Sequence, residues 1–238
     1  IIRTAGNNVA RFDHDPVTGK SFGLLVEEER TNLVEDSEDL TEWAAHGSAT
    51  VTANNATAPD NSATADKLTN VSHNYDGRRI AVSISTSTTY TVSGFIKSVD
   101  QPRTKFGVMH SVDGWFTYVD TNWDASGTPS TPASSGASNI TYENYGNNWY
   151  RVSFNFTSPS SISSGETRFI IQADRTNTQK SIYFWGAQLE LGSFPTSYIP
   201  TSGSTATRSG EVISITGTNF SSWYNQTEST VAVSWNKP

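Results

Sequence analysis

Short runs with an alternating apolar pattern recur along most of this chain and constrain its fold more than any other feature. From Ser48 onward they are rich in Val, Thr, Ile, Tyr and Phe, and Gly, Asn, Asp or Pro separates one run from the next. Because successive side chains in a strand point to opposite faces, this spacing predicts a series of short strands. We place them near residues 48–53, 64–69, 79–84, 89–98, 104–110, 115–120, 139–143, 149–157, 167–174 and 181–191.

Helical periodicity is scarce. The candidate is about one turn over residues 39–45, for which Ser37 or Asp39 would serve as the N-cap. Many short strands with long connections suit two antiparallel sheets packed face to face. The sequence therefore predicts an all-β fold, a β-sandwich of jelly-roll type.

The two ends of the chain differ from its middle. Residues 1–30 hold the turn "DHDPVTGK" and the run "FGLLVEEE", which predict a lead-in arm that ends in one strand. Residues 31–208 would form the sandwich, with 124–138 as a loop at its edge. Residues 209–238 contain strand-like runs at 211–216 and 230–235. They predict the start of a following domain or strands that add to this one, in a piece of a longer protein.

Composition narrows the class of protein. The 238 residues include no cysteine, which excludes disulfides and thiolate metal sites. Charged residues are 16% of the chain, and Ser, Thr, Asn and Gly are abundant, as is typical of extracellular β-proteins. A net charge of −7 argues against nucleic-acid binding. No apolar run is long enough to predict membrane insertion.

Three fragments together carry a family resemblance. They are "RFDHDPVTGKSFGLLVEEERTNLV" (11–34), "NNWYRVSFNFTS" (147–158) and "IYFWGAQLELGSFPTSYIPTSGSTATR" (182–208). The chain resembles bacteriophage tail and structural proteins in which a carbohydrate-binding-module-like jelly roll lies between such an arm and a laminin-G or concanavalin-like domain. The resemblance implies a protein of the virion surface or tail, or an extracellular one, with sugar-binding potential. By analogy with virion appendages, a homotrimer is expected.

The same resemblance suggests a structural calcium ion. Carbohydrate-binding modules of this fold carry a carboxylate and an aromatic residue near the start of the domain. In this chain "NLVEDSEDLTEW" (32–43) stands at that place, with Glu38 matching the carboxylate and Trp43 matching the aromatic residue. Those modules often close with "DDV", whose Asp holds the calcium, whereas this chain has Trp185-Gly186-Ala187-Gln188. Oxygen-rich loops suit calcium, so we predict that any metal is calcium near Glu38. No organic cofactor is expected.

The run at 182–191 has a structural interpretation. It would be the last strand of the sandwich, beside the arm strand that begins it. Pro195 and Pro200 would end the ladder, because proline cannot donate to it.

Aromatic residues decide whether a β-sandwich can bind sugars, because a pyranose ring stacks on Trp or Tyr. Trp149 and Trp185 have apolar neighbours and are predicted to be core. Strict alternation puts Trp115, Thr117 and Val119 on one side of a strand and Phe116 and Tyr118 on the other. Either set could be core, and we favour an exposed Trp115. The predicted ligand-binding residues are Trp115, Tyr75, Tyr118, Arg78, Arg79, His73 and His110. For residues 71–79 the alternative is a solvated loop.

Catalysis has no support in the sequence. The acidic runs at 27–29 and 35–39 are typical of solvated segments, the four histidines stand alone, and no nucleophile elbow or phosphate loop occurs. We therefore predict a non-enzyme, a carbohydrate-binding module of a phage tail or virion surface protein. The alternatives are a purely structural or assembly domain of a virion and, with less support, a polysaccharide depolymerase.

Overall fold

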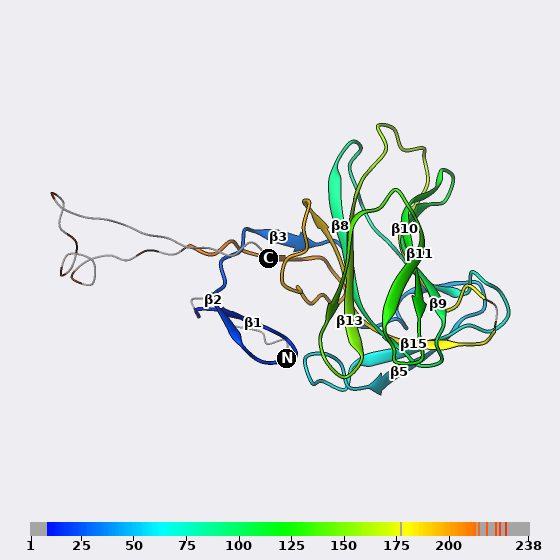
Figure 1. Cartoon of the computed structure of the whole chain (residues 1–238). Coiled ribbons are helices and arrows are strands. Elements are labelled where there is room, and N and C mark those ends of the chain that lie inside the picture. The colour runs from blue at the N-terminus through cyan, green and yellow to red at the C-terminus, as the bar shows by residue number, and fades with distance from the viewer. Residues whose placement is uncertain are drawn as a thin grey trace.

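The computed structural model describes residues 9–176, 178–212, 214, 218, 222, 224 and 227. The elements from β1 to β16 are all strands, and most of them form two six-stranded antiparallel sheets that face each other (Figure 1). The predicted all-β jelly-roll sandwich is thus confirmed. Within the described residues, no helix is long and apolar enough to cross a membrane.

The first sheet has the order β11-β10-β9-β14-β7-β4, and the second has the order β12-β13-β8-β15-β6-β5. The strands of the first sheet are β4 (Ala44–His46), β7 (Gly77–Ala81), β9 (Arg103–His110), β10 (Gly114–Trp123), β11 (Pro129–Ser135) and β14 (Thr167–Gln172). Those of the second are β5 (Thr50–Ala56), β6 (Ala65–Thr69), β8 (Thr89–Ser98), β12 (Ser138–Asn144), β13 (Trp149–Thr157) and β15 (Ser181–Leu191). Two small ribbons pair β1 (Phe12–His14) with β2 (Ser21–Leu24), and β3 (Arg30–Asn32) with β16 (Ala206–Arg208).

The core between the sheets is built on aromatic rings from both sides. Phe106 of the first sheet lies 5.9 Å from Phe154 and 5.9 Å from Phe184 of the second, measured between ring centroids. It also meets Phe169 at 5.1 Å in an edge-to-face contact, the geometry that aromatic pairs favour. A Cβ atom on Gly94 would come within about 3.0 Å of the Phe106 ring. Glycine at this position therefore makes room for the rings.

A bulge in β15 explains the Trp-Gly in the middle of this strand. Pairing with β8 shifts between Trp185 and Gln188, and Gly186 has a φ of 65°, a conformation that glycine adopts at little cost. The bulge changes which residues face the core. Before it the even-numbered residues Ile182 and Phe184 point inward, and after it the odd-numbered residues Ala187 and Leu189 do so. Trp185 is odd-numbered and precedes the bulge, so it faces the outer side of the second sheet.

Part of the outer side of the second sheet, around Trp185, is covered by residues 192–203, which we call the exit segment. Trp185 and Trp149 are 1% and 2% exposed, which confirms that both are core residues. Trp185 lies 5.3 Å from the Phe95 ring and 4.6 Å from the Tyr198 ring of the exit segment. These contacts form a second apolar cluster outside the sandwich interior.

Asn32 joins the arm to the exit segment and to β15. Its side-chain amide donates to the carbonyls of Ala187 and Ile199, both at 2.9 Å. Next to it, the Leu33 N–H donates to the Leu189 carbonyl at 2.8 Å. The segment of β3 and Leu33, which follows the predicted arm, therefore lies beside the end of β15, whereas the strand within the arm run, β2, pairs with β1. β15 itself is a central strand paired with β8 and β6.

Local structure differs from expectation at several places within the described residues. Residues 124–138 were expected to be a loop, but 129–135 form β11, which pairs with β10 alone at the sheet edge. The expected helical turn over 39–45 is wrong, because Asp39 accepts hydrogen bonds from Thr41 and the chain then enters β4. The strand expected at 230–235, and half of the one at 211–216, lie outside the described residues; residues 211, 212 and 214, which are described, are not in a strand.

Candidate ligand-binding face

A bulge in β10 brings Trp115 and Tyr118 to the outer face of the first sheet, the face that points away from the second sheet. Trp115 pairs with Met109, but Thr117 pairs with Val108, so one residue is inserted between them. Thr117 and Val119 consequently face the interior and are fully buried. The strict alternation that we expected for this strand is therefore wrong. The partly exposed rings of Trp115 and Tyr118 lie 5.6 Å apart.

Register across four strands defines the neighbours of Tyr118. Tyr118 pairs with Gly107, Gly107 with Ile170, and Ile170 with Arg79. Directly paired residues of antiparallel strands point to the same face, so Arg79 shares the outer face with Tyr118. A Cβ atom on Gly107 would lie 2.3 Å from the Thr117 carbonyl oxygen. The bulge thus requires glycine here, and the sheet surface beside Tyr118 lacks a side chain.

Lys105 lies directly beneath the two aromatic rings. Its Nζ is 3.4 Å from the Tyr118 centroid and 5.1 Å from that of Trp115, within the range of a cation–π interaction. The same atom is 3.5 Å from the Asp120 Oδ1. Lys105, Asp120 and Gln172 form one row across the sheet and are 6%, 4% and 2% exposed. Because these side chains are buried among their neighbours on the outer face, their positions are fixed, and the charges of Lys105 and Asp120 are held in place.

Arginines surround this row. The Arg103 Nη2 is 2.8 Å from the Asp120 Oδ2, and Arg175 donates to the Gln172 side chain at 3.4 Å. Burial lowers the pKa of Lys105; Asp120 opposes this effect, and the charges of Arg175 and Arg103 add to it. The cations are thus close enough to influence one another.

The loop before β7 stands at the other side of the same face. The Tyr75 ring stacks on His73 at 4.9 Å and meets His46 of β4 at 6.0 Å. Tyr75 is 43% exposed. Burial lowers the pKa of His46, and the charges of Arg79 and Arg168 lower it further. The loop aromatics are therefore neighbours of the outer-face arginines.

Asp76 holds this loop in place. Its fully buried carboxylate accepts hydrogen bonds from the backbone N–H groups of Ser48 at 2.8 Å, Val71 at 3.1 Å, Ser72 at 2.8 Å and His73 at 3.0 Å. Burial raises the pKa of Asp76, but these donors outweigh burial and lower it to about 2. The position of the loop aromatics therefore depends on an ionised carboxylate.

The structure separates the predicted ligand-binding residues into two groups. Trp115, Tyr118 and Arg79 lie on the outer face, with Tyr75 and His73 at its side. His110 is 1% exposed, stacks on Phe116 at 5.8 Å, and accepts N–H bonds through Nδ1. Arg78 points to the opposite side and donates to the carbonyls of Trp43 and Ala49. His110 and Arg78 are therefore not available to a ligand on the outer face.

Other outer-face residues were missed by sequence reasoning. They are Arg103, Lys105, Met109, Asp120, Arg168 and Gln172. The alternation within β9 could have found Lys105 and Met109, because they flank the core positions 106 and 108. Nothing in the sequence signals that Asp120 and Gln172 would share a row with Lys105.

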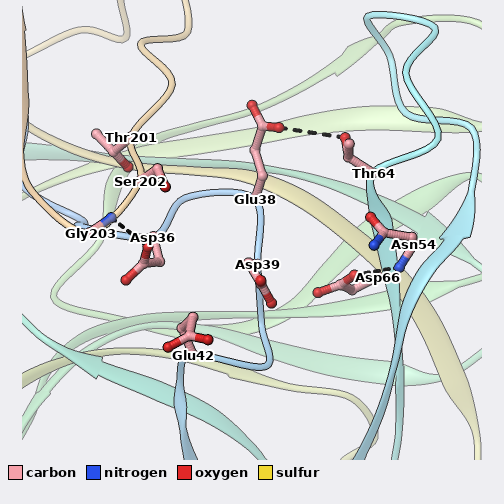
Figure 2. Close-up of a pocket in the computed structure, with 10 residues that line it drawn as sticks. All are labelled: Asp36, Glu38, Asp39, Glu42, Asn54, Thr64, Asp66, Thr201, Ser202 and Gly203. Atoms are coloured by element: carbon pink, nitrogen blue, oxygen red, sulfur yellow. Dashed lines mark hydrogen bonds between the residues drawn. The ribbon is translucent and has the colours of Figure 1, made fainter.

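Glu38 lies in a different place, at an acidic pocket of about 530 Å³. The pocket is lined by Asp36, Glu38, Asp39, Glu42, Asn54, Thr64, Asp66, Thr201, Ser202 and Gly203. Figure 2 shows the Glu38 carboxylate directed toward Thr64, away from Asp39 and Glu42. The Tyr198 hydroxyl donates to the Glu38 carboxylate at 3.0 Å, and burial raises the pKa of Glu38. Among the described residues, no three His, Cys, Asp or Glu side chains are arranged to hold a metal ion. Calcium near Glu38 stays a prediction.

No protein-family model matches the chain, and no curated protein matches its sequence. The fold is similar to that of the CBM22-1 xylan-binding domain from Paenibacillus barcinonensis Xyn10C, with 14% identity, a TM-score of 0.42, and coverage of 70% of this chain and 94% of that one. The fold is also similar to that of the C-terminal family 22 carbohydrate-binding module of Clostridium thermocellum Xyn10B. That match has 17% identity and a TM-score of 0.42, and it covers 71% of this chain and 98% of that one.

A third similar structure is the enzymatically active domain of tailspike protein 4 from bacteriophage CBA120. It has 12% identity and a TM-score of 0.40, and the match covers 68% of this chain and 21% of that one. All three likenesses concern the fold alone.

Proposed function

We propose that the chain is a non-catalytic carbohydrate-binding module that holds a polysaccharide on the outer face of its first sheet. The observation that carries this proposal is the pair of partly exposed rings, Trp115 and Tyr118, placed above the buried row of Lys105, Asp120 and Gln172. A sugar ring stacks its C–H face on an aromatic ring while its hydroxyls bond to polar groups around it. This face supplies both.

The carboxylates of this face are engaged in ion pairs, which fits a module that binds a sugar without hydrolysing it. Hydrolysis of a glycosidic bond ordinarily uses two carboxyl groups that flank the bond. Within the strands of the first sheet, the outer face presents Asp120, which is engaged by Arg103 and Lys105. Glu166, just before β14, is engaged by Arg168. Neither is placed opposite a free carboxyl partner among the described residues of this face.

The setting that we propose is a phage tail or virion surface protein that docks to host or environmental polysaccharide. It is supported by the three sequence fragments that resemble phage tail proteins. Stacking with a few hydrogen bonds gives weak binding, and an affinity of about micromolar to millimolar is expected for one chain. Display of several copies on one particle would raise the effective affinity.

Affinity gel electrophoresis against a panel of polysaccharides tests the proposal. The parent protein should be retarded by at least one polymer. Trp115→Ala should lose most of that retardation, because it removes the stacking surface but no core contact. Tyr183→Ala is the matched control, since Tyr183 is a partly exposed tyrosine on the outer side of the second sheet. Equal retardation of the parent and Trp115→Ala would refute the placement of the site, and a parent that no polymer retards would refute the function.

A further inference from the structure

Several cations gather on the outer face of the first sheet, although the chain as a whole is acidic. The chain has 16 Lys and Arg against 23 Asp and Glu, a net charge of −7. Five of the cations gather on or beside this face: Arg79, Arg103, Lys105, Arg168 and Arg175. The carboxylates near them are Asp120 and Glu166, together with the fully buried Asp174 and Asp76, which are held by backbone N–H groups. Five cations thus lie near four carboxylates, so whether this face can take an anion depends on which cation lacks a partner.

Structural roles account for some of these cations. Arg103 pairs with Asp120, and Arg168 pairs with the exposed Glu166. Arg175 donates to the Asn74 carbonyl and to Gln172. Lys105 is held by Asp120 and the aromatic rings.

Arg79 has no such role. Within the described part of the chain, its guanidinium has no ion-pair partner and donates no hydrogen bond. An unpaired Nε is shared with Arg78, Arg103 and Arg175, but the terminal nitrogens of those three have partners. The neighbouring Arg78 is the contrast, because it donates to two backbone carbonyls. Arg79 is only partly exposed, between Ile170 and Ala44 in the register of the sheet. A partly desolvated guanidinium without a partner is unfavourable in the free protein, and an anion that binds it would remove this penalty.

We propose that the polysaccharide bound here is anionic, with carboxylate or sulfate groups that pair with Arg79 while a neighbouring sugar ring stacks on Trp115 or Tyr118. This inference rests on the proposed function and names the class of its ligand. A guanidinium offers a fixed fork of donors that matches a carboxylate or a sulfate in a bidentate pair. Arg168, opposite Met109 and one row from Arg79, supplies a second cation for the next acidic group.

An anionic glycan fits this face better than a nucleic acid. The cations and the aromatic rings lie on or beside the four neighbouring strands β10, β9, β14 and β7, which together span about 14 Å at the usual strand spacing. A densely charged polymer such as a nucleic acid would extend beyond that width, where the net charge of −7 of the chain repels it. A glycan with spaced acidic groups meets the cations of this face and extends past it at lower electrostatic cost. Binding of nucleic acid in place of glycan would therefore overturn the inference.

Matched polymers test this idea. Affinity electrophoresis would compare polygalacturonate with the same polymer after methyl esterification, which removes the charge and keeps the backbone. Sparsely sulfated dextran and unmodified dextran form the second pair and distinguish sulfate from carboxylate. We expect retardation by at least one charged member at 50 mM salt, at least about tenfold weaker binding to its neutral partner, and weakening as salt increases.

The substitution Arg79→Gln separates a specific site from general charge attraction. It should weaken binding to the charged polymer about tenfold, the effect of losing one charged hydrogen-bonding group. Lys97→Gln is the control, because Lys97 is a partly buried lysine on the outer side of the second sheet and its loss changes the net charge equally. Thermal unfolding of both variants would be measured alongside.

Each outcome decides a different point. Equal binding to charged and neutral partners, lost in Trp115→Ala but kept in Arg79→Gln, would overturn the anionic ligand and leave the proposed function standing. Equal losses in Arg79→Gln and Lys97→Gln, or stronger binding to single-stranded DNA than to every glycan, would also overturn it. If no polymer retards the parent, the proposed function and this inference fail together.

Discussion

Asp76→Asn is expected to destabilise the protein by about 2 kcal/mol at pH 7. The folded pKa of Asp76 is about 2, against an ordinary value of 3.8, and each pH unit of difference corresponds to about 1.4 kcal/mol. Asparagine keeps the size of the side chain but not the charge that the four N–H donors stabilise. The side-chain NH₂ group of asparagine is itself a donor, so where it replaces a carboxylate oxygen the backbone N–H groups would lose their acceptor.

The pH dependence of this effect has a definite sign. Because the pKa is lower in the folded state, the contribution is complete above the unfolded value of 3.8 and is lost as pH falls toward about 2. Roughly half of it should remain at pH 3. The gap in unfolding free energy between the parent and Asp76→Asn should therefore shrink between pH 6 and pH 3.

Urea unfolding followed by tryptophan fluorescence at pH 6, 4 and 3 measures this gap. Glu35→Gln is the control, since Glu35 is exposed and its loss changes the net charge by the same amount. A variant as stable as the parent, or a gap that stays constant over this range, would refute the reasoning. The same experiment bears on the ligand site, because Asp76 positions the loop of His73 and Tyr75.

Two further predictions concern stability. Trp185→Ala should cost about 3 to 5 kcal/mol, because it empties a buried site and removes the hydrogen bond from Nε1 to Thr64; urea unfolding would show it, and a loss below about 1 kcal/mol would contradict the exit-segment packing. If calcium binds near Glu38, a chelator should lower the melting temperature and Glu38→Gln should abolish that shift. A metal-free protein with an unchanged melting curve would count against calcium.

The long strands could be predicted almost to the residue. The expected ranges 89–98, 149–157 and 181–191 coincide with β8, β13 and β15. Each contributes alternate apolar residues to the core, so its hydrophobic pattern is strong. By contrast, "PSTPASS" in β11 has almost no apolar signal and two prolines. An edge strand needs hydrogen bonds on one side only and can hold proline, which hides it from sequence reasoning.

The candidate site was predictable only in part. Sequence reasoning named the two segments that carry Tyr75 and Trp115, and the structure places both on one sheet through β7 and β10. It could not foresee the bulge after Trp115, because a bulge depends on the register with Met109 and Val108 in the neighbouring strand. The same dependence on long-range register hid the row that contains Lys105.

The pairing of β3 with β16 has a mechanical consequence. Arg30 pairs with Arg208 and Asn32 with Ala206, so the flanking segments leave the ribbon at the same end, as Figure 1 also shows. Beyond this ribbon the Glu211 N–H still donates to the Glu27 carbonyl at 3.0 Å, so tension along those segments should act first on that contact and then on the pair of Arg30 and Arg208. The contacts then open one step at a time, instead of shearing together. The ribbon is thus a compliant link, and the sandwich bears force only after it has opened.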